Sequence, residues 1–119
     1  MDMATDFTSG TAFPRRGRDA YDGYLWILRA FDKARAARAG TIHDYIYPCP
    51  MDLGVMERWG ITSEEFDAAV ATHATDPEIL DWLKARVDDE HRDAANHWLV
   101  TEKWYNLDRQ DAEEGVVAA

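Results

Sequence analysis

The sequence predicts an all-α protein, a small single-domain helical bundle of four or five helices with an extended arm rich in tyrosine and proline. Three observations carry this prediction. The chain has 119 residues, the size of one domain with one core. Helix start and stop signals recur along it, with apolar residues at helical spacing between them. No internal repeat or sustained heptad pattern indicates a solenoid or a coiled coil.

The first expected helix runs over residues 22–39. This segment is rich in Leu, Ala and Arg, which favour helix, and Gly40 stands where a glycine commonly ends one. A short helix is expected over residues 53–59, because Asp52 can cap its start and Gly60 can end it.

The clearest local signature in the chain starts the next helix. Thr62 is placed as the N-cap, and Glu65, three residues on, as its capping-box partner. Ile61 and Phe66 can form the accompanying hydrophobic staple. A helix over residues 63–73 is therefore predicted.

A last helix is expected to open at Thr75 or Asp76, followed by Pro77 and Glu78. It can extend beyond Trp98. Its apolar positions at helical spacing are Ile79, Leu83, Val87, Ala94 and Trp98.

The remaining segments lack helical patterns. Residues 41–50 mix β-branched and aromatic side chains with two prolines, so we expect an extended arm or a short strand without a pairing partner. Residues 1–12 are expected to be a flexible N-terminal segment and residues 110–119 a flexible acidic tail, leaving 13–109 as the helical domain.

The net charge of −10 is unevenly distributed. Residues 1–59 hold eight acids and eight bases, whereas residues 60–119 hold fifteen acids and five bases. The acidic half repels phosphate backbones, so no nucleic-acid partner is expected, and an anionic partner should meet the Arg-rich first half. The alternative is an acidic half that serves only as a solvated surface.

Several features indicate a cytoplasmic protein. The chain has no apolar run near the ~20 residues that a membrane span requires, so no membrane partner is expected. Its first twenty residues lack the apolar core of a secretory signal. A single cysteine agrees with a reducing compartment.

A charged triplet stands out on the first helix. Asp32 lies three residues after Arg29 and three before Arg35, so both guanidinium groups can reach its carboxylate. One interpretation is an ion-pair network that fixes the helix against its neighbours. A second is that Arg29 or Arg35 grips a carboxylate or phosphate of a ligand. A third is exposed pairs of little consequence.

The only cysteine, Cys49, lies between two prolines and shortly before the helix that Asp52 opens. A sulfur near a helix N-terminus is in a setting that activates cysteines. The alternative is a small apolar residue that fills space in the core. His43 is the nearest histidine in sequence that could act as its base.

We expect no metal and no cofactor. Asp88, Glu90, His91 and His97 crowd one segment, but the chain contains no Glu-x-x-His, Cys-x-x-Cys or His-Glu-x-x-His spacing. His91 is better interpreted as a hydrogen-bonded residue at the margin of the core.

Most of the five tryptophans are expected in the core, because they occupy helical positions. Trp104 and Tyr105 are the exceptions, since they lie near the end of the chain beside polar residues. They can form an exposed aromatic patch for a partner or for a second copy of the chain.

Short motifs in a fixed order carry a family resemblance over residues 14–83. They are Pro14, Arg18-Asp19, Gly23-Tyr24, Leu28-Arg29, Asp32-Lys33-Ala34-Arg35, Ala39-Gly40-Thr41, Tyr45, Cys49-Pro50-Met51-Asp52, Gly60-Ile61, Phe66 and Asp81-Trp82-Leu83. With these the chain resembles the bacterial family catalogued as domain of unknown function 5069. The resemblance implies a small, mostly helical domain and brings no established activity. A site shared with the family would involve Arg29, Asp32, Lys33, Arg35, Tyr45, Cys49 and Asp52.

Two functions remain open. The first is a cytoplasmic protein, not an enzyme, that binds a protein partner or forms a homo-oligomer, because aromatic residues are abundant and no complete catalytic motif is present. The alternative is a protein that binds an anionic small molecule, or an enzyme acting on one. In that case Arg29, Lys33, Arg35 and Tyr45 would hold the anionic group, Asp32 or Asp52 would handle protons, and Cys49 would be the reactive centre.

Overall fold

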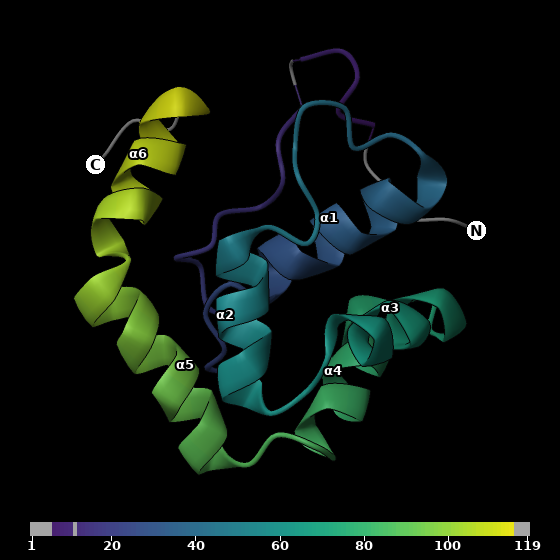
Figure 1. The fold of residues 1–119 in the computed structure, drawn as a ribbon. Helices are drawn as coiled ribbons and strands as arrows, with labels where there is room; N and C mark the ends of the chain where they lie inside the picture. Colours follow the sequence, from purple (N-terminus) through teal and green to yellow (C-terminus); the bar gives the residue numbers. More distant parts are fainter. Residues whose placement is uncertain (1–5, 11, 116–119) are drawn as a thin grey trace.

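The computed structural model describes residues 6–10 and 12–115, and these residues form six α-helices without a β-strand (Figure 1). The predicted all-α class is confirmed, but the predicted number of four or five helices is too low. Residues 1–5 and 11, in the expected N-terminal segment, and 116–119, in the expected tail, lie outside this description. The helices are α1 (Ile27–Ala39), α2 (Pro50–Trp59), α3 (Ser63–Thr72), α4 (Asp76–Lys84), α5 (Asp89–Glu102) and α6 (Trp104–Glu113).

The first helix starts at Ile27, not at Asp22 as expected. Residues 21–24 form a tight turn in which Tyr21 and Tyr24 exchange backbone hydrogen bonds of 3.0 Å. Asp22 and Trp26 have φ angles of 51° and 73°. Such left-handed conformations cannot belong to a regular right-handed helix, so the helix begins after them.

The N-terminus of α2 differs from the expectation in its capping residue. Cys49 is the N-cap, and its Sγ accepts a hydrogen bond from the Asp52 backbone N–H at 3.5 Å. Asp52 is the reciprocal partner, since its carboxylate accepts from the Cys49 N–H at 2.9 Å. The helix therefore starts earlier, at Pro50. The predicted capping box of α3 is confirmed, with Thr62 and Glu65 bonded in both directions at 2.9 and 3.1 Å.

The expected long last helix is three helices. The first break falls after α4. There the carboxylate of Asp88 accepts a hydrogen bond from the backbone N–H of His91 and caps the start of α5. The break shifts the register of the buried face. Ala95 and Leu99 are buried in α5, in place of the expected Ala94 and Trp98.

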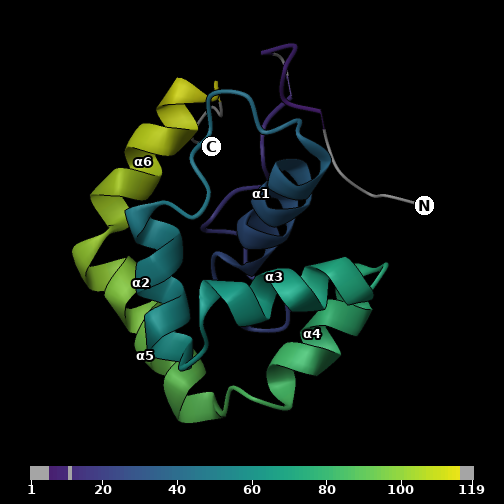
Figure 2. The same cartoon turned by 45° about the vertical axis from the view of Figure 1, so that its right-hand side comes forward.

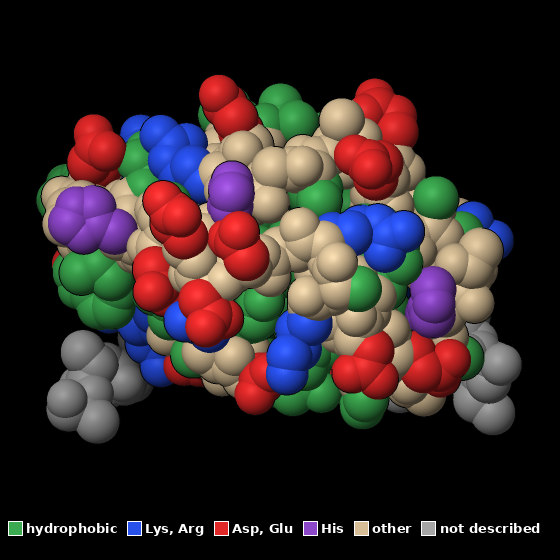
Figure 3. All heavy atoms as spheres, turned by 90° about the horizontal axis from the view of Figure 1, so that it is seen from below, with side chains coloured by type: hydrophobic (Ala, Val, Ile, Leu, Met, Phe, Trp, Pro, Cys, Tyr) green, Lys and Arg blue, Asp and Glu red, His purple; other side chains and the backbone are tan. Residues whose placement is uncertain are grey.

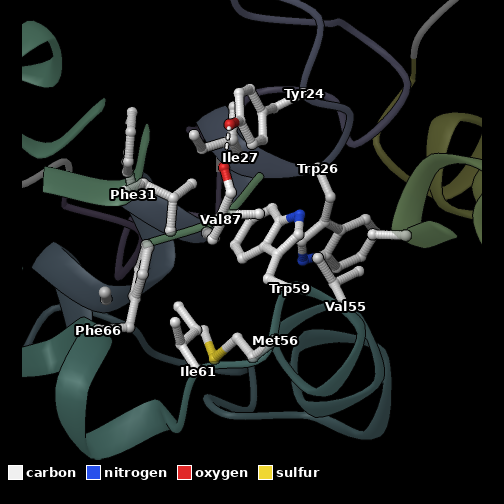
Figure 4. Packing of buried hydrophobic residues seen from close by; sticks show 14 of the residues in the cluster. Tyr24, Trp26, Ile27, Phe31, Val55, Met56, Trp59, Ile61, Phe66 and Val87 are labelled. Atoms are coloured by element: carbon white, nitrogen blue, oxygen red, sulfur yellow. Dashed lines mark hydrogen bonds between the residues drawn. The ribbon is translucent and has the colours of Figure 1, made fainter. Parts of the chain in front are cut away.

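In both views α2, α5 and α6 lie to the left of α1, and α3 and α4 lie below it (Figures 1 and 2). On one side α2 packs against α5, which continues into α6, and on the other α3 packs against α1 and α4. Aromatic rings fill the space between them: Phe31 stacks on Phe66 with centroids 6.1 Å apart, and Trp59 lies next to Phe66. The Tyr24 hydroxyl donates to the Val87 carbonyl at 3.3 Å (Figure 4).

The tyrosine- and proline-rich arm over residues 41–49 consists of turns and bends. Its side chains tie it to the rest of the protein. The ring of Tyr45 meets that of Phe7 edge to face at 5.3 Å, and the Tyr47 hydroxyl donates to Asp67 at 2.5 Å. In the part of the chain described, no helix has the length and apolar character to cross a bilayer.

Candidate functional site: buried charges around the central helix

Helix α1 carries four charged side chains in the interior. Arg29, Asp32, Lys33 and Arg35 are each between 3% and 9% exposed. Every residue of α1 from 29 to 36 is buried, so other parts of the chain surround this helix. Buried charges are costly unless they are paired. Each of these four has its partner on a different element.

Asp32 is held by the segment that precedes α1. The backbone N–H of Arg15 donates to Asp32 Oδ2 at 2.8 Å, and the Arg15 guanidinium reaches both carboxylate oxygens. Within residues 6–10 and 12–115, no hydrogen bond or ion pair joins Asp32 to Arg29 or Arg35. The triplet proposed from sequence spacing therefore does not form, because Arg15 occupies the carboxylate.

Arg35 pairs with Asp76 at the start of α4, at 2.5 Å, and Arg15 reaches the same carboxylate at 2.9 Å. Burial by itself raises the pKa of Asp76, but the hydrogen bonds from Arg15 and Arg35 outweigh it and hold that pKa below the ordinary value of 3.8. Together with Asp32 these residues form a chain of alternating charges that joins α1 to α4.

Lys33 meets the start of α2. Its Nζ lies 2.7 Å from Asp52 Oδ2 and 3.3 Å from the Sγ of Cys49. Asp52 also accepts hydrogen bonds from Trp26 Nε1 at 2.8 Å and from the Cys49 backbone N–H. Both oxygens of this fully buried carboxylate are thus occupied by donors. The structure brings three predicted site residues together here, namely Lys33, Cys49 and Asp52.

Arg29 binds the carboxylate of Glu114, which is 85 positions away in the sequence. Its Nη1 and Nη2 donate to Glu114 Oε1 and Oε2 at 3.1 and 2.6 Å, and the Tyr45 hydroxyl donates to Oε2 at 3.0 Å. The Arg29 and Glu114 side chains are only 4% and 7% exposed. The rings of Trp26 and Tyr45 each lie 5.7 Å from the guanidinium carbon. Burial, followed by the Glu114 carboxylate, raises the pKa of Tyr45 to about 12.

Glu114 was not among the expected site residues, because it lies in the segment expected to be a tail. A signal was available. Asp108, Asp111 and Glu114 recur every three residues and so share one side of a helix. In the structure Asp108 pairs with Arg18 at 2.6 Å, and Asp111 pairs with Arg16 and Arg18.

A sequence profile of the family described as Domain of unknown function (DUF5069) matches residues 11–118. The chain belongs to this family. The match continues past the resemblance seen over residues 14–83 and includes all six helices, so the acidic side of α6 lies within the family domain. No curated protein matches the chain.

Two histidines of this DUF5069 protein, His91 and His43, pair with nearby aspartates that do not belong to the cluster around α1. His91 Nδ1 contacts Asp88 at 2.6 Å, which raises the pKa of His91. His43 is exposed and pairs with Asp44, and within the described residues none of the hydrogen bonds of Cys49 involves His43. Among these residues, no group of three or more His, Cys, Asp or Glu side chains could hold a metal ion.

A cavity of about 290 Å³ opens beside the cluster, between α1, the arm and α3. It does not bring Asp32, Arg35 and Cys49 into one hollow, since none of them lines it. Its lining residues are Ala34, Ala37, Arg38, Tyr47, Pro48, Asp67 and Val70.

Proposed function

We propose that the protein binds a small molecule through a carboxylate, which Arg29 and Tyr45 hold in the position that Glu114 fills. One observation carries the proposal: the buried guanidinium of Arg29 gives two donors to a single carboxylate, and Tyr45 adds a third. Bidentate contact with a buried arginine is a common way for proteins to recognise carboxylates. Glu114 then acts as an internal stand-in for the ligand.

Glu114 is placed where it can leave without unfolding the core. It is the C-cap residue of α6, one position beyond the last helical residue, and within Trp104–Glu113 only Leu107 is buried. Asp52, the partner of Lys33, lies instead in the first turn of α2, where it also completes the capping box. Because Glu114 lies just outside its helix and Asp52 lies within one, Arg29 can exchange its partner more readily than Lys33.

The same contacts argue against acid–base chemistry at the other candidates. Donors from the protein occupy the oxygens of Asp32 and of Asp52. These bonds support structural roles for the two carboxylates. The proposal is therefore one of binding, without a catalytic step.

A second candidate is the interaction module expected from the sequence. Exposed apolar side chains support it, above all Tyr105, which is 78% exposed. The others are Phe13, Ile46, Leu53, Val100 and Trp104. They are spread over several elements, and on the face shown in Figure 3 acidic, basic and apolar side chains are interspersed. Light scattering on the wild type and on Tyr105→Ser tests it: a strictly monomeric wild type rules out self-association.

The binding proposal is tested with Glu114→Gln, using Glu113→Gln as the matched control. Glu113 is exposed, and its pair with Arg109 is distant, at 3.8 Å. In sodium chloride, we expect Glu114→Gln to lower the melting temperature. In sodium acetate at the same ionic strength, we expect part of this loss to be restored. The restoration should vanish when Arg29→Met is added.

Glu113→Gln should show neither effect, because its carboxylate is solvated. Acetate that stabilises both variants equally would contradict a carboxylate site at Arg29.

A further inference from the structure

We infer that the natural ligand carries several carboxylates and binds by displacing α6, which covers a row of guanidinium groups. This inference rests on the proposed function and names the class of ligand for the same site. It starts from the acidic side of α6. Three carboxylates there contact three cations, in the pairs Asp108 with Arg18, Asp111 with Arg16 and Arg18, and Glu114 with Arg29.

The spacing of the acids describes the ligand that would replace them. Residues three apart on a helix are separated by about 4.5 Å along its axis. The row of carboxylates therefore extends over about 9 Å. A compact molecule with two or three carboxylates can reach Arg29 and at least one neighbouring guanidinium together.

The basic row is attached to the core independently of the acids. Arg16 and Arg18 flank Gly17, whose carbonyl accepts the Trp26 N–H at 2.7 Å. A Cβ at Gly17 would lie 2.4 Å from the Trp26 ring, so the backbone rests directly on this buried side chain. The backbone that carries Arg16 and Arg18 thus has contacts with the core that do not involve the acids of α6.

The carboxylates of α6 satisfy these cations incompletely. Arg29 Nε and Arg18 Nε are buried without a hydrogen-bond partner among the described residues. Arg18 Nε lies 3.1 Å from Asp111 but not in hydrogen-bonding geometry. The helix fixes the Cα positions of Asp108 and Asp111, whereas a flexible polycarboxylate can turn its oxygens toward the unpaired donors. The unpaired donors therefore favour an incoming ligand.

Helix α6 is attached in a way that permits its release. Lys103 separates it from α5 with φ −120° and ψ 5°, and no side chain caps its first turn. Figure 1 shows α6 following α5 along one side of the molecule, with a bend between the two helices. Leu107 is the buried residue of Trp104–Glu113, and the ion pairs of Asp108, Asp111 and Glu114 add to what holds this helix in place.

The net charge of −10 limits the size of the ligand. The acidic second half repels a long polyanion, while a small polycarboxylate meets only the arginines beneath α6. A nucleic acid is therefore disfavoured.

The test compares propane-1,2,3-tricarboxylate with butyrate by calorimetry on the full chain. We expect the tricarboxylate to bind roughly tenfold more tightly, the effect of about one additional charge-assisted hydrogen bond. Arg16→Gln should remove most of this gain, whereas Arg109→Gln, on the exposed side of α6, should keep it. Hydrogen exchange in α6, but not in α1, should accelerate when the tricarboxylate binds.

Each other outcome has a distinct meaning. Equal affinities for the two acids that both depend on Arg29 would overturn the polycarboxylate inference and keep the proposed function. No binding of either acid, even to Glu114→Gln, would overturn both. A peptide of residues 108–114 that binds while the tricarboxylate does not would replace the small molecule with a protein segment.

Discussion

The ammonium group of Lys33 lies 2.7 Å from the carboxylate of Asp52, and the two side chains are only 5% and 0% exposed. This pair joins the middle of the central helix to the first turn of α2. Trp26 and the backbone of Cys49 complete the coordination of the carboxylate. The arrangement is a buried ion pair with its hydrogen bonds satisfied, so loss of one partner leaves a charge without compensation.

Lys33→Met is therefore expected to lower the free energy of unfolding by about 3–5 kcal/mol. Lys84→Met is the control, because Lys84 pairs with Asp22 on the surface, where the two side chains are 52% and 48% exposed. Its cost should stay within about 1 kcal/mol. Urea denaturation measures both. If the two variants lose the same free energy of unfolding, the buried ion pair of Lys33 contributes no more to stability than the exposed pair of Lys84.

Gly54→Ala should destabilise the protein although alanine is the better helix former. Helix propensity favours alanine by about 1 kcal/mol. A Cβ at Gly54, however, would lie 2.3 Å from the ring of Trp98 on α5. Overpacking of this kind costs about 1–3 kcal/mol, so the net effect is a loss. Urea titrations measure this loss in the free energy of unfolding, and adding Trp98→Leu should reduce it. If Gly54→Ala is more stable than the wild type, the contact between α2 and α5 is loose.

Asp76 should contribute to stability in a pH-dependent way. Its pKa is held below 3.8 in the folded protein by Arg15 and Arg35, despite the opposing effect of burial. Its contribution is thus fully present above the pKa of the unfolded chain and is lost as the pH falls through the folded value. Wild type should be more stable than Asp76→Asn at neutral pH, and the difference should shrink below about pH 4. A difference that does not vary with pH would contradict this.

Tyr45 should lose its proton at a higher pH than an ordinary tyrosine. Burial and the Glu114 carboxylate raise its pKa to about 12. Glu114→Gln removes the negative charge and should lower the pKa of Tyr45, while the contribution of burial stays. Carbon-13 spectra of the tyrosine rings, assigned with Tyr45→Phe, follow the titration. An unchanged pKa in Glu114→Gln would mean that the two side chains do not meet in solution.

The helix class and several helix ends could be predicted because their causes are local. The capping box of Thr62 and Glu65 involves residues three apart, and Gly40 ends α1 with φ 75° as expected. The start of α1 could not be predicted. Trp26 takes its left-handed conformation in a turn that the distant Gly17 closes by accepting its N–H.

In the candidate site, too, local features could be predicted and long-range contacts could not. Its charged residues on α1 were identified from the sequence. The partners of Asp32, Arg35 and Arg29 were not, because they are 17, 41 and 85 positions away in the chain. Spacing on one helix indicates only which groups can meet. Which groups do meet depends on long-range packing that brings carboxylates and guanidinium groups from other segments onto α1. The expected domain boundary at residue 109 and the roles of the site residues stay predictions.

The most direct measurement is nitrogen-15 NMR of the arginine Nε–H groups during a titration of Glu114→Gln with acetate. We expect a saturable shift of the Arg29 signal, because acetate can displace the neutral amide that this variant places against the guanidinium, and little change at Arg109 on the exposed side of α6. An Arg29 signal that does not move, or that moves no more than those of the surface arginines, would contradict a carboxylate site at this residue.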